Sequence, residues 1–249
     1  MQQGLDTAQL APAAKLSVRV AHSARDIRRA QKLRYQVFAK EMGAQLASAE
    51  DGIDRDEYDP YCDHLIVEDN QTGKLVGTYR MLPPHKARQL PSLYSEHEFD
   101  LSRLDGIRDG IIEIGRSCVH KDYRRGAVIA LLWAGLADYV RQQGGRYLAG
   151  CASVSLADGG HQAVSLYRML EHKHLCPAEW RVTPHLALPL GEVQDDTQVP
   201  VPPLIKGYLR AGAWVCGEPA WDPDFNCADF FMLLPMNRLD LRHQRHFAG

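Results

Sequence analysis

The chain has 249 residues, of which 45% are hydrophobic and 24% are charged, as in an ordinary globular protein. Its formal net charge of −2 gives no broad positive field, and its basic residues are dispersed, so nucleic-acid binding is excluded. The start of the chain lacks the features of a signal peptide, and the longest uncharged apolar run, 127–137, is too short to span a membrane. We expect a cytoplasmic protein and leave open a peripheral contact with the inner face of the membrane.

The first part of the chain is predicted to form an arm, a strand and a long helix. Residues 1–15 are predicted to be a flexible N-terminal arm, and the alternating run 16–21 a strand. A helix is expected over 24–42, capped by Ser23 or Asp26, because apolar residues recur there near helical spacing. An irregular acidic segment follows.

Strands and helices alternate through the rest of the chain. Further strands are expected at 64–68, 75–82, 111–119, 147–153 and 228–234. Helices are expected within 85–109 and at 126–142, 163–172 and 204–211. This order predicts a mixed α/β sandwich, and we treat 16–249 as a single domain.

Cysteine and histidine spacing argues against metal and disulfide chemistry. The six cysteines are scattered without a CxxC pair, which excludes a zinc ribbon or a disulfide framework and predicts reduced thiols. Cys118 and Cys151 lie in apolar surroundings and are predicted to be core residues rather than nucleophiles. His64, His120 and His161 show no metal-ligand spacing, so we predict no metal site.

The predicted strand 111–119 carries one acid and one base, Glu113 and Arg116. Three residues apart, these side chains point to opposite faces of a regular strand, so a bulge is needed to bring them to one side. Glu113 is suited to take a proton from an incoming ammonium during amide formation. The alternative is a structural ion pair of Glu113 with Arg80 or Arg116.

A basic turn, Tyr123-Arg124-Arg125-Gly126, stands between this strand and a strongly apolar helix. The free N–H groups and the dipole at a helix N-terminus bind a phosphate well. The turn and the charged pair upstream of it together predict the transfer of a group from a phosphate-tethered carrier.

Seven acids and one base, Arg55, fall within residues 50–63. The acids are Glu50, Asp51, Asp54, Asp56, Glu57, Asp59 and Asp63. Such a cluster attracts a cation, for which a diamino acid is a candidate. The alternative is a solvated loop.

Ordered motifs cover about residues 25 to 155. They are Arg34-Tyr35-Gln36-Val37-Phe38, Asp56 with Asp59, the runs 62–67 and 77–82, Tyr94-Ser95-Glu96, Phe99-Asp100-Leu101, the run 113–119, Tyr123-Arg124 and Leu131-Leu132-Trp133. These motifs resemble the GNAT-fold ornithine lipid N-acyltransferases, a family related to N-acyl-homoserine lactone synthases and N-acyl amino acid synthases. The portion from about residue 195 matches more loosely.

The resemblance implies a GNAT α/β fold, with a mixed twisted sheet and helices on both faces. It implies transfer of a 3-hydroxyacyl chain from acyl carrier protein to the α-amine of L-ornithine, giving a lyso-ornithine lipid. No cofactor is expected beyond the acyl-carrier-protein or acyl-coenzyme A thioester as co-substrate. The alternatives are the same chemistry on another amino acid or amine, including a lactone-type signal, and a non-enzymatic module that binds acyl carrier protein.

The resemblance also implies roles for individual residues. Catalysis falls to Glu113 and Arg116. Substrate binding is assigned to Arg34, Phe38, Asp56, Asp59 and Arg80. At the charged positions of this set the related lactone synthases have a network that is either functional or purely structural. Acyl-donor binding falls to Cys118, Val119, Arg124, Arg125 and Gly126.

The turn 124–128 departs from the usual GNAT pattern, Arg/Gln-x-x-Gly-x-Gly/Ala, which favours a carrier-protein donor over free coenzyme A. An acyl carrier protein is strongly acidic, so its docking surface on this chain should be basic. The candidates are Lys121, Arg124, Arg125, Arg141 and Arg146.

Overall fold

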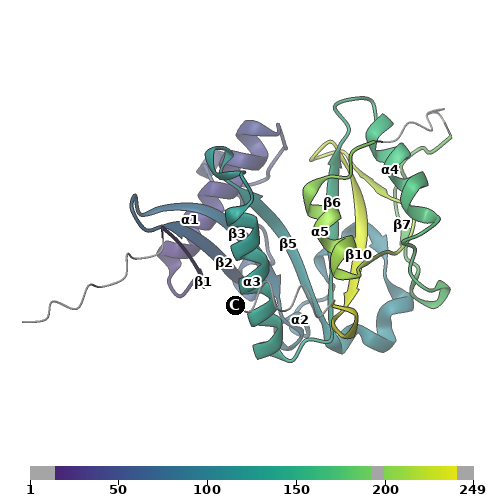
Figure 1. Ribbon diagram of the computed structural model, residues 1–249, viewed down its shortest axis with the longest axis horizontal. Helices are drawn as coiled ribbons and strands as arrows, with labels where there is room; N and C mark the ends of the chain where they lie inside the picture. Colours follow the sequence, from purple (N-terminus) through teal and green to yellow (C-terminus); the bar gives the residue numbers. More distant parts are fainter. Residues whose placement is uncertain (1–14, 192–198, 240–249) are drawn as a thin grey trace, which may run out of the picture.

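A computed structural model describes residues 15–191 and 199–239 (Figure 1). The predicted N-terminal arm lies outside the described residues except for Lys15. The described chain forms a mixed sheet with helices packed against it. The predicted α/β class and GNAT-type layering are confirmed.

One mixed sheet has the strand order β1-β2-β3-β5-β6-β10-β8, with β9 paired to β10. Its strands are β1 Leu16–Val20, β2 Asp63–Asp69, β3 Lys74–Leu82, β5 Ile111–Val119, β6 Tyr147–Ser155, β8 Trp214–Val215, β9 Ala220–Asp222 and β10 Cys227–Pro235. A second, two-stranded sheet pairs β4 Phe99–Asp100 with β7 Thr183–Pro184. The six long strands match the predictions, whereas β4, β7, β8 and β9 are too short to show an alternating pattern.

The helices are α1 Ala24–Tyr35, α2 Pro84–Ala87, α3 Ala127–Gln143, α4 His161–Glu171 and α5 Pro203–Ala211. Ser23 caps α1, its side chain accepting a hydrogen bond from the backbone N–H of Asp26. The helix predicted over 24–42 continues past α1 as the π-helical segment Gln36–Glu41. This change of winding re-aims Phe38 relative to a straight α-helix.

The helices α1 and α3 cover opposite faces of the sheet formed by β1, β2, β3 and β5 (Figure 1). Four buried apolar residues of α3 recur every four positions and pack on that sheet: Val128, Leu132, Leu136 and Val140. Each such side chain contributes about 1.5–3 kcal/mol when fully buried. Gly77 of β3 leaves room for this packing, since a Cβ there would meet Cγ1 of Val128 at 2.4 Å.

The strands β5 and β6 pair in parallel only at their beginnings, from Ile111 opposite Tyr147 to Glu113 opposite Ala149, and then diverge (Figure 1). On its other edge β5 carries a bulge, because Thr78 pairs with Cys118 but Arg80 pairs with Gly115. Within this bulge the backbone of Arg116 has a φ of +49°, rare for a residue with a side chain. The predicted bulge is therefore confirmed, and the central strands splay beside it.

No helix within 15–191 or 199–239 is both long enough and apolar enough to cross a membrane. All six cysteines are free, in keeping with the reduced thiols predicted. Cys118 is buried as expected, and Cys151 is partly buried.

Candidate active site

A cavity of about 570 Å³ occupies the space where β5 and β6 diverge. Every residue of β5 from Glu113 to Val119 lines it, and Cys151 and Ser153 face it from β6. The bulge thus brings Glu113 and Arg116 to the same cavity, as the sequence required.

Glu113 is only 6% exposed and is held by backbone amides. Its Oε2 accepts a hydrogen bond from the N–H of Tyr94 and its Oε1 one from the N–H of Ser95, each at 2.8 Å. In the part of the chain that the structure describes, no Lys, Arg or His lies within ion-pair distance of this carboxylate, so the alternative of an ion pair with Arg80 or Arg116 is wrong. Burial raises the pKa of Glu113 above its usual value, which makes it a stronger base.

The floor of the cavity rests on a network of arginines and aspartates. Arg34 is fully buried, with Nε 2.8 Å from Oδ2 of Asp54 and Nη2 2.8 Å from Oδ2 of Asp59. His64 also contacts Asp59, its Nε2 lying 3.3 Å from Oδ1. Burial and the charge of Arg34 lower the pKa of His64 to about 4, so this histidine is neutral at pH 7.

The same network continues to the cavity wall through Asp56. Its two oxygens each lie 2.6 Å from Nη1 of Arg80, and Oδ2 lies 3.5 Å from Nη2 of Arg116. Burial opposes ionisation of Asp56, but the charges of Arg80 and Arg116 lower its pKa overall. Nε of Arg116 also lies 3.2 Å from Oδ2 of Asp54.

The acidic segment 50–63 therefore fits neither of its two predicted roles completely. Asp54, Asp56 and Asp59 are engaged by arginines and leave no net negative charge for a cationic substrate. Glu50, Asp51 and Glu57 are exposed, as a solvated loop requires.

Two aromatic rings hold the guanidinium of Arg116 in the cavity. It lies 4.7 Å from the ring centre of Tyr94 and 4.9 Å from that of Phe225, and its Nη1 donates to the Tyr94 hydroxyl at 3.0 Å. Phe38 lines the cavity nearby and meets Phe225 edge-on, with ring centres 5.9 Å apart. The sequence singled out Arg116 and Phe38, but not Phe225, which lies far along the chain.

The cavity thiols are poor nucleophiles. Burial raises the pKa of Cys118 to about 12 and that of Cys151 well above its usual value. Because a thiolate is needed for attack on a thioester, the geometry favours direct transfer to the acceptor over an acylated cysteine.

Residues 33–134 match the acetyltransferase (GNAT) domain. The L-ornithine N(alpha)-acyltransferase of Brucella abortus (strain 2308) is 34% identical over 94% of this chain and 89% of its own length. This degree of identity over nearly the whole of both chains decides the family. The chain belongs to the L-ornithine N(alpha)-acyltransferases.

Two solved structures share the fold of this acyltransferase. FeeM, an N-acyl amino acid synthase from uncultured soil microbes, has a TM-score of 0.57 at 10% identity, covering 92% of this chain and 97% of its own. BjaI, a CoA-dependent acyl-homoserine lactone synthase solved with MTA, has a TM-score of 0.55 at 18% identity, covering 93% and 89%. The curated relatives and the matched GNAT domain make the chain an N-acyltransferase enzyme, and they do not support the alternative of a non-enzymatic binding module.

The predicted donor-side residues of this acyltransferase divide between the cavity and its rim. Cys118, Val119 and Arg124 line the cavity, and Nε of Arg124 donates to the carbonyl of Val119 at 3.0 Å. Arg125 is exposed on the turn, and Gly126, with a φ of +99°, is the N-cap of α3. Only a residue without a Cβ adopts such a φ at low cost, so Gly126 sets how the helix starts.

The predicted basic docking surface is wrong for two of its five residues. Lys121, Arg124 and Arg125 are exposed around the start of α3. Arg141 lies fourteen residues farther along α3, roughly 20 Å away at 1.5 Å per residue. The backbone of Arg146 bonds to Gly110, beside the paired end of β5. A helix of this length separates residues that are only moderately distant in sequence.

Three carboxylates at the other end of the cavity were not singled out in the sequence. Glu98, Asp222 and Asp229 all line it. Asp229 is the one charged residue in the apolar strand β10, CADFFMLLP, and that isolation was the available signal. The sequence did not reveal that the fold brings Glu98 to it.

Proposed function

We propose that this acyltransferase transfers a 3-hydroxyacyl chain from an acyl carrier protein thioester to the α-amine of L-ornithine. The product is a lyso-ornithine lipid. The names of the curated relatives specify ornithine and its α-nitrogen. The observation that carries the proposal is Glu113, a buried carboxylate with a raised pKa at the point where the central strands open into a cavity.

Glu113 serves as the base for the incoming amine. The ammonium first transfers a proton to this carboxylate, directly or through water. The free amine then attacks the thioester carbonyl carbon, so that the C–N bond forms and the C–S bond breaks. A second proton is transferred from the nitrogen to the sulfur of the leaving group, which is released as a thiol. The amides of Tyr94 and Ser95 keep the carboxylate oriented through this sequence.

Arg116 positions the acceptor rather than accepting a proton. A guanidinium remains charged throughout, and its donors match a carboxylate such as that of an amino acid. Tyr94 and Phe225 fix its plane, while Asp54 and Asp56 balance its charge. Arg80 and Arg34 support this arrangement from behind through Asp56 and Asp59.

The acyl donor occupies the other side of the cavity. Beyond Glu113 the backbone of β5 has no partner on β6 in the described chain, so an extended pantetheine arm can pair with it as an added strand does. The start of α3 is the proposed phosphate site, because no side chain caps its N–H groups and Arg125 is exposed beside it; Arg124, paired with Glu41 at 2.6 Å, would exchange that partner for the phosphate.

Isotope-labelled ornithine tests the reaction. Purified protein is incubated with a 3-hydroxyacyl carrier-protein thioester and L-ornithine carrying ¹⁵N at either the α or the δ position. We expect the amide proton of the product to couple to ¹⁵N only in the α-labelled sample. Acylation at the δ-nitrogen, or no turnover of ornithine, contradicts the proposal.

A salt series tests the carrier protein as donor. Docking steered by Lys121, Arg124 and Arg125 weakens as salt screens exposed charges beyond a Debye length of ~8 Å at physiological ionic strength. Matched carrier-protein and coenzyme A thioesters are compared as donors. We expect the carrier protein to be the better donor at low salt and to lose more rate as salt rises. Equal rates and equal salt slopes contradict the carrier-protein assignment.

A further inference from the structure

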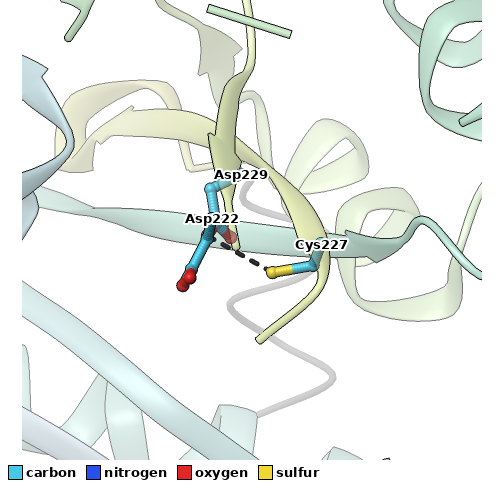
Figure 2. Close-up of side chains that lie close together, drawn as sticks. All are labelled: Asp222, Cys227 and Asp229. Carbon is cyan, nitrogen blue, oxygen red and sulfur yellow. Dashed lines mark hydrogen bonds between the residues drawn. The ribbon is translucent and has the colours of Figure 1, made fainter. Parts of the chain in front are cut away.

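One end of the active-site cavity is acidic and has no basic counterpart. Glu98, Asp222 and Asp229 line it, and Figure 2 shows Asp222 and Asp229 gathered with Cys227 at the junction of β9 and β10. Within residues 15–191 and 199–239, no Lys, Arg or His lies within ion-pair distance of these three carboxylates. This is the reverse of the cavity floor, where each aspartate meets an arginine.

Of the carboxyl groups at this acidic end, Asp229 is buried, whereas Glu98 and Asp222 are partly buried. Asp229 is 3% exposed; its Oδ1 accepts from the Ser153 hydroxyl at 2.6 Å, its Oδ2 accepts from the thiol of Cys227 at 3.5 Å, and the carboxyl group of Glu98 lies within hydrogen-bonding reach of it. Oε2 of Glu98 is buried without a hydrogen-bond partner in the described chain. Burial and the neighbouring charges of Asp229 and Asp222 raise the pKa of Glu98 to about 9. A carboxyl group with a pKa of about 9 is protonated at pH 7, and a cation bound beside it favours the ionised form, so binding of an ammonium group here releases the proton of Glu98.

The acidic end lies close to the proposed base. The backbone N–H of Ser95 holds Glu113, and the Ser95 hydroxyl accepts from the thiol of Cys151 at 3.6 Å. The neighbouring charges of Glu98 and Asp229 in turn help to raise the pKa of Cys151. One small molecule with two amino groups can therefore present one of them to Glu113 and the other to Asp229.

We propose that Asp229 and Glu98 bind the second, δ-ammonium group of ornithine and so select a diamino acid as acceptor, an assignment that rests on the proposed N-acyl transfer. The δ-ammonium supplies three donors and one positive charge to a pocket that is lined by three carboxyl groups and, in the described chain, has no cationic side chain within ion-pair distance of them. The α-amine, three methylenes and the Cα away, then faces Glu113. The arginine network contributes no attraction for this group because its charges balance.

A divalent metal ion is the competing occupant. Asp222, Cys227 and Asp229 each offer one ligand atom, and these atoms lie within 4.8 Å of one another (Figure 2). In this structure the thiol of Cys227 donates a hydrogen bond to Asp229, and ligation of a metal would require the loss of that proton. Glu98, whose oxygen most lacks a partner, is not among the three candidate ligands.

Norvaline tests the assignment because it is ornithine without the δ-amine. The values of kcat/KM for ornithine and norvaline are measured for wild type, Asp229→Asn and Glu98→Gln. Both variants keep side-chain shape while removing the carboxylate. Asp224→Asn is the matched control, since Asp224 is exposed in the same β9–β10 turn and does not line the cavity.

We expect wild type to prefer ornithine by ~30-fold or more, and each cavity variant to lose most of that preference, chiefly through a higher KM for ornithine. Norvaline turnover should fall far less, and Asp224→Asn should keep the wild-type preference. Equal losses for both substrates show a structural role and overturn the proposal. Loss of the preference after treatment of wild type with a chelator, with recovery on adding Zn²⁺, assigns the pocket to a metal instead. Absence of ornithine turnover by wild type refutes the proposed function itself rather than this pocket.

Discussion

The two charged regions of the cavity are built in opposite ways. On the floor, Arg34 and Arg80 pair with Asp54, Asp56 and Asp59 at distances of 2.6 to 2.8 Å. At the end formed by β9 and β10, carboxylates face the cavity without a cationic partner in the described chain. The ion pairs of the floor fix the position of the segment 50–63, whereas the carboxyl groups at the β9–β10 end are available to a ligand. The number of acidic residues in the sequence does not show which carboxylates are paired with an arginine and which have no cationic partner.

Among the substitutions considered, replacement of Glu113 should cause the largest loss of activity. Glu113→Gln should lower kcat by ~10²–10⁴, the usual contribution of a general base. Steady-state kinetics with ornithine and an acyl thioester measure this, and circular dichroism checks that the variant is folded. A folded variant within a few-fold of wild type would assign Glu113 a structural role.

Breaking the paired region should unfold the protein more easily. Arg34→Ala removes the closest cation from the buried carboxylates of Asp54 and Asp59, which keep only the longer contacts with Arg116 and Arg80, so we expect the free energy of unfolding to fall by ~3–5 kcal/mol. Urea denaturation measures the loss. The control is Arg88→Ala, whose pair with Asp109 is exposed and contributes ~0–1 kcal/mol. Similar losses for the two variants would mean that the floor network does not hold the loop.

The contribution of the acidic end to the free energy of unfolding should change with pH in the opposite direction to that of the floor. Glu98 has a pKa of about 9 in the folded protein and a lower one when unfolded, so the folded state binds more protons and loses stability as pH rises between those values. Each unit of pKa difference corresponds to about 1.4 kcal/mol. Asp56, whose pKa is lowered, instead loses its contribution as pH falls into the acid range.

Glu98→Gln should therefore reduce the loss of stability between pH 6 and pH 8 in urea denaturation. The same pH dependence in variant and wild type would show that Glu98 is not the responsible group.

Substitutions at the proposed donor-binding residues Arg124 and Arg125 should have the smallest effect on the kinetics. Replacing Arg124 and Arg125 with Ala should raise the KM for the acyl donor by roughly tenfold, since a charge-assisted hydrogen bond contributes about 1.5–3 kcal/mol. The KM for ornithine should change less, because these side chains lie at the start of α3, away from the acceptor. An unchanged donor KM would place the phosphate elsewhere.

Local patterns in the sequence were sufficient to predict most of the fold. The apolar runs of β2, β3 and β5 and the cap of α1 at Ser23 appear in the structure close to their predicted places. The need for a bulge followed from the spacing of Glu113 and Arg116 alone. These features depend on neighbours in the chain, which a sequence displays directly.

The acidic end could not be predicted because it depends on contacts between distant segments. Glu98 directly precedes β4 and Asp229 lies in the last long strand, β10, and these elements belong to two different sheets that meet at one cavity. The same limit explains why Asp54 was grouped with a cation-binding cluster. Its partners, Arg34 and Arg116, come from α1 and β5.

Mass spectrometry of lipids from cells that express this chain, with and without added ornithine, tests the central claim most directly. Wild type should accumulate an acylated ornithine that increases with the added amino acid, and Glu113→Gln at equal protein level should not. Absence of an ornithine-dependent lipid in wild type, or an equal amount in the variant, would contradict the account.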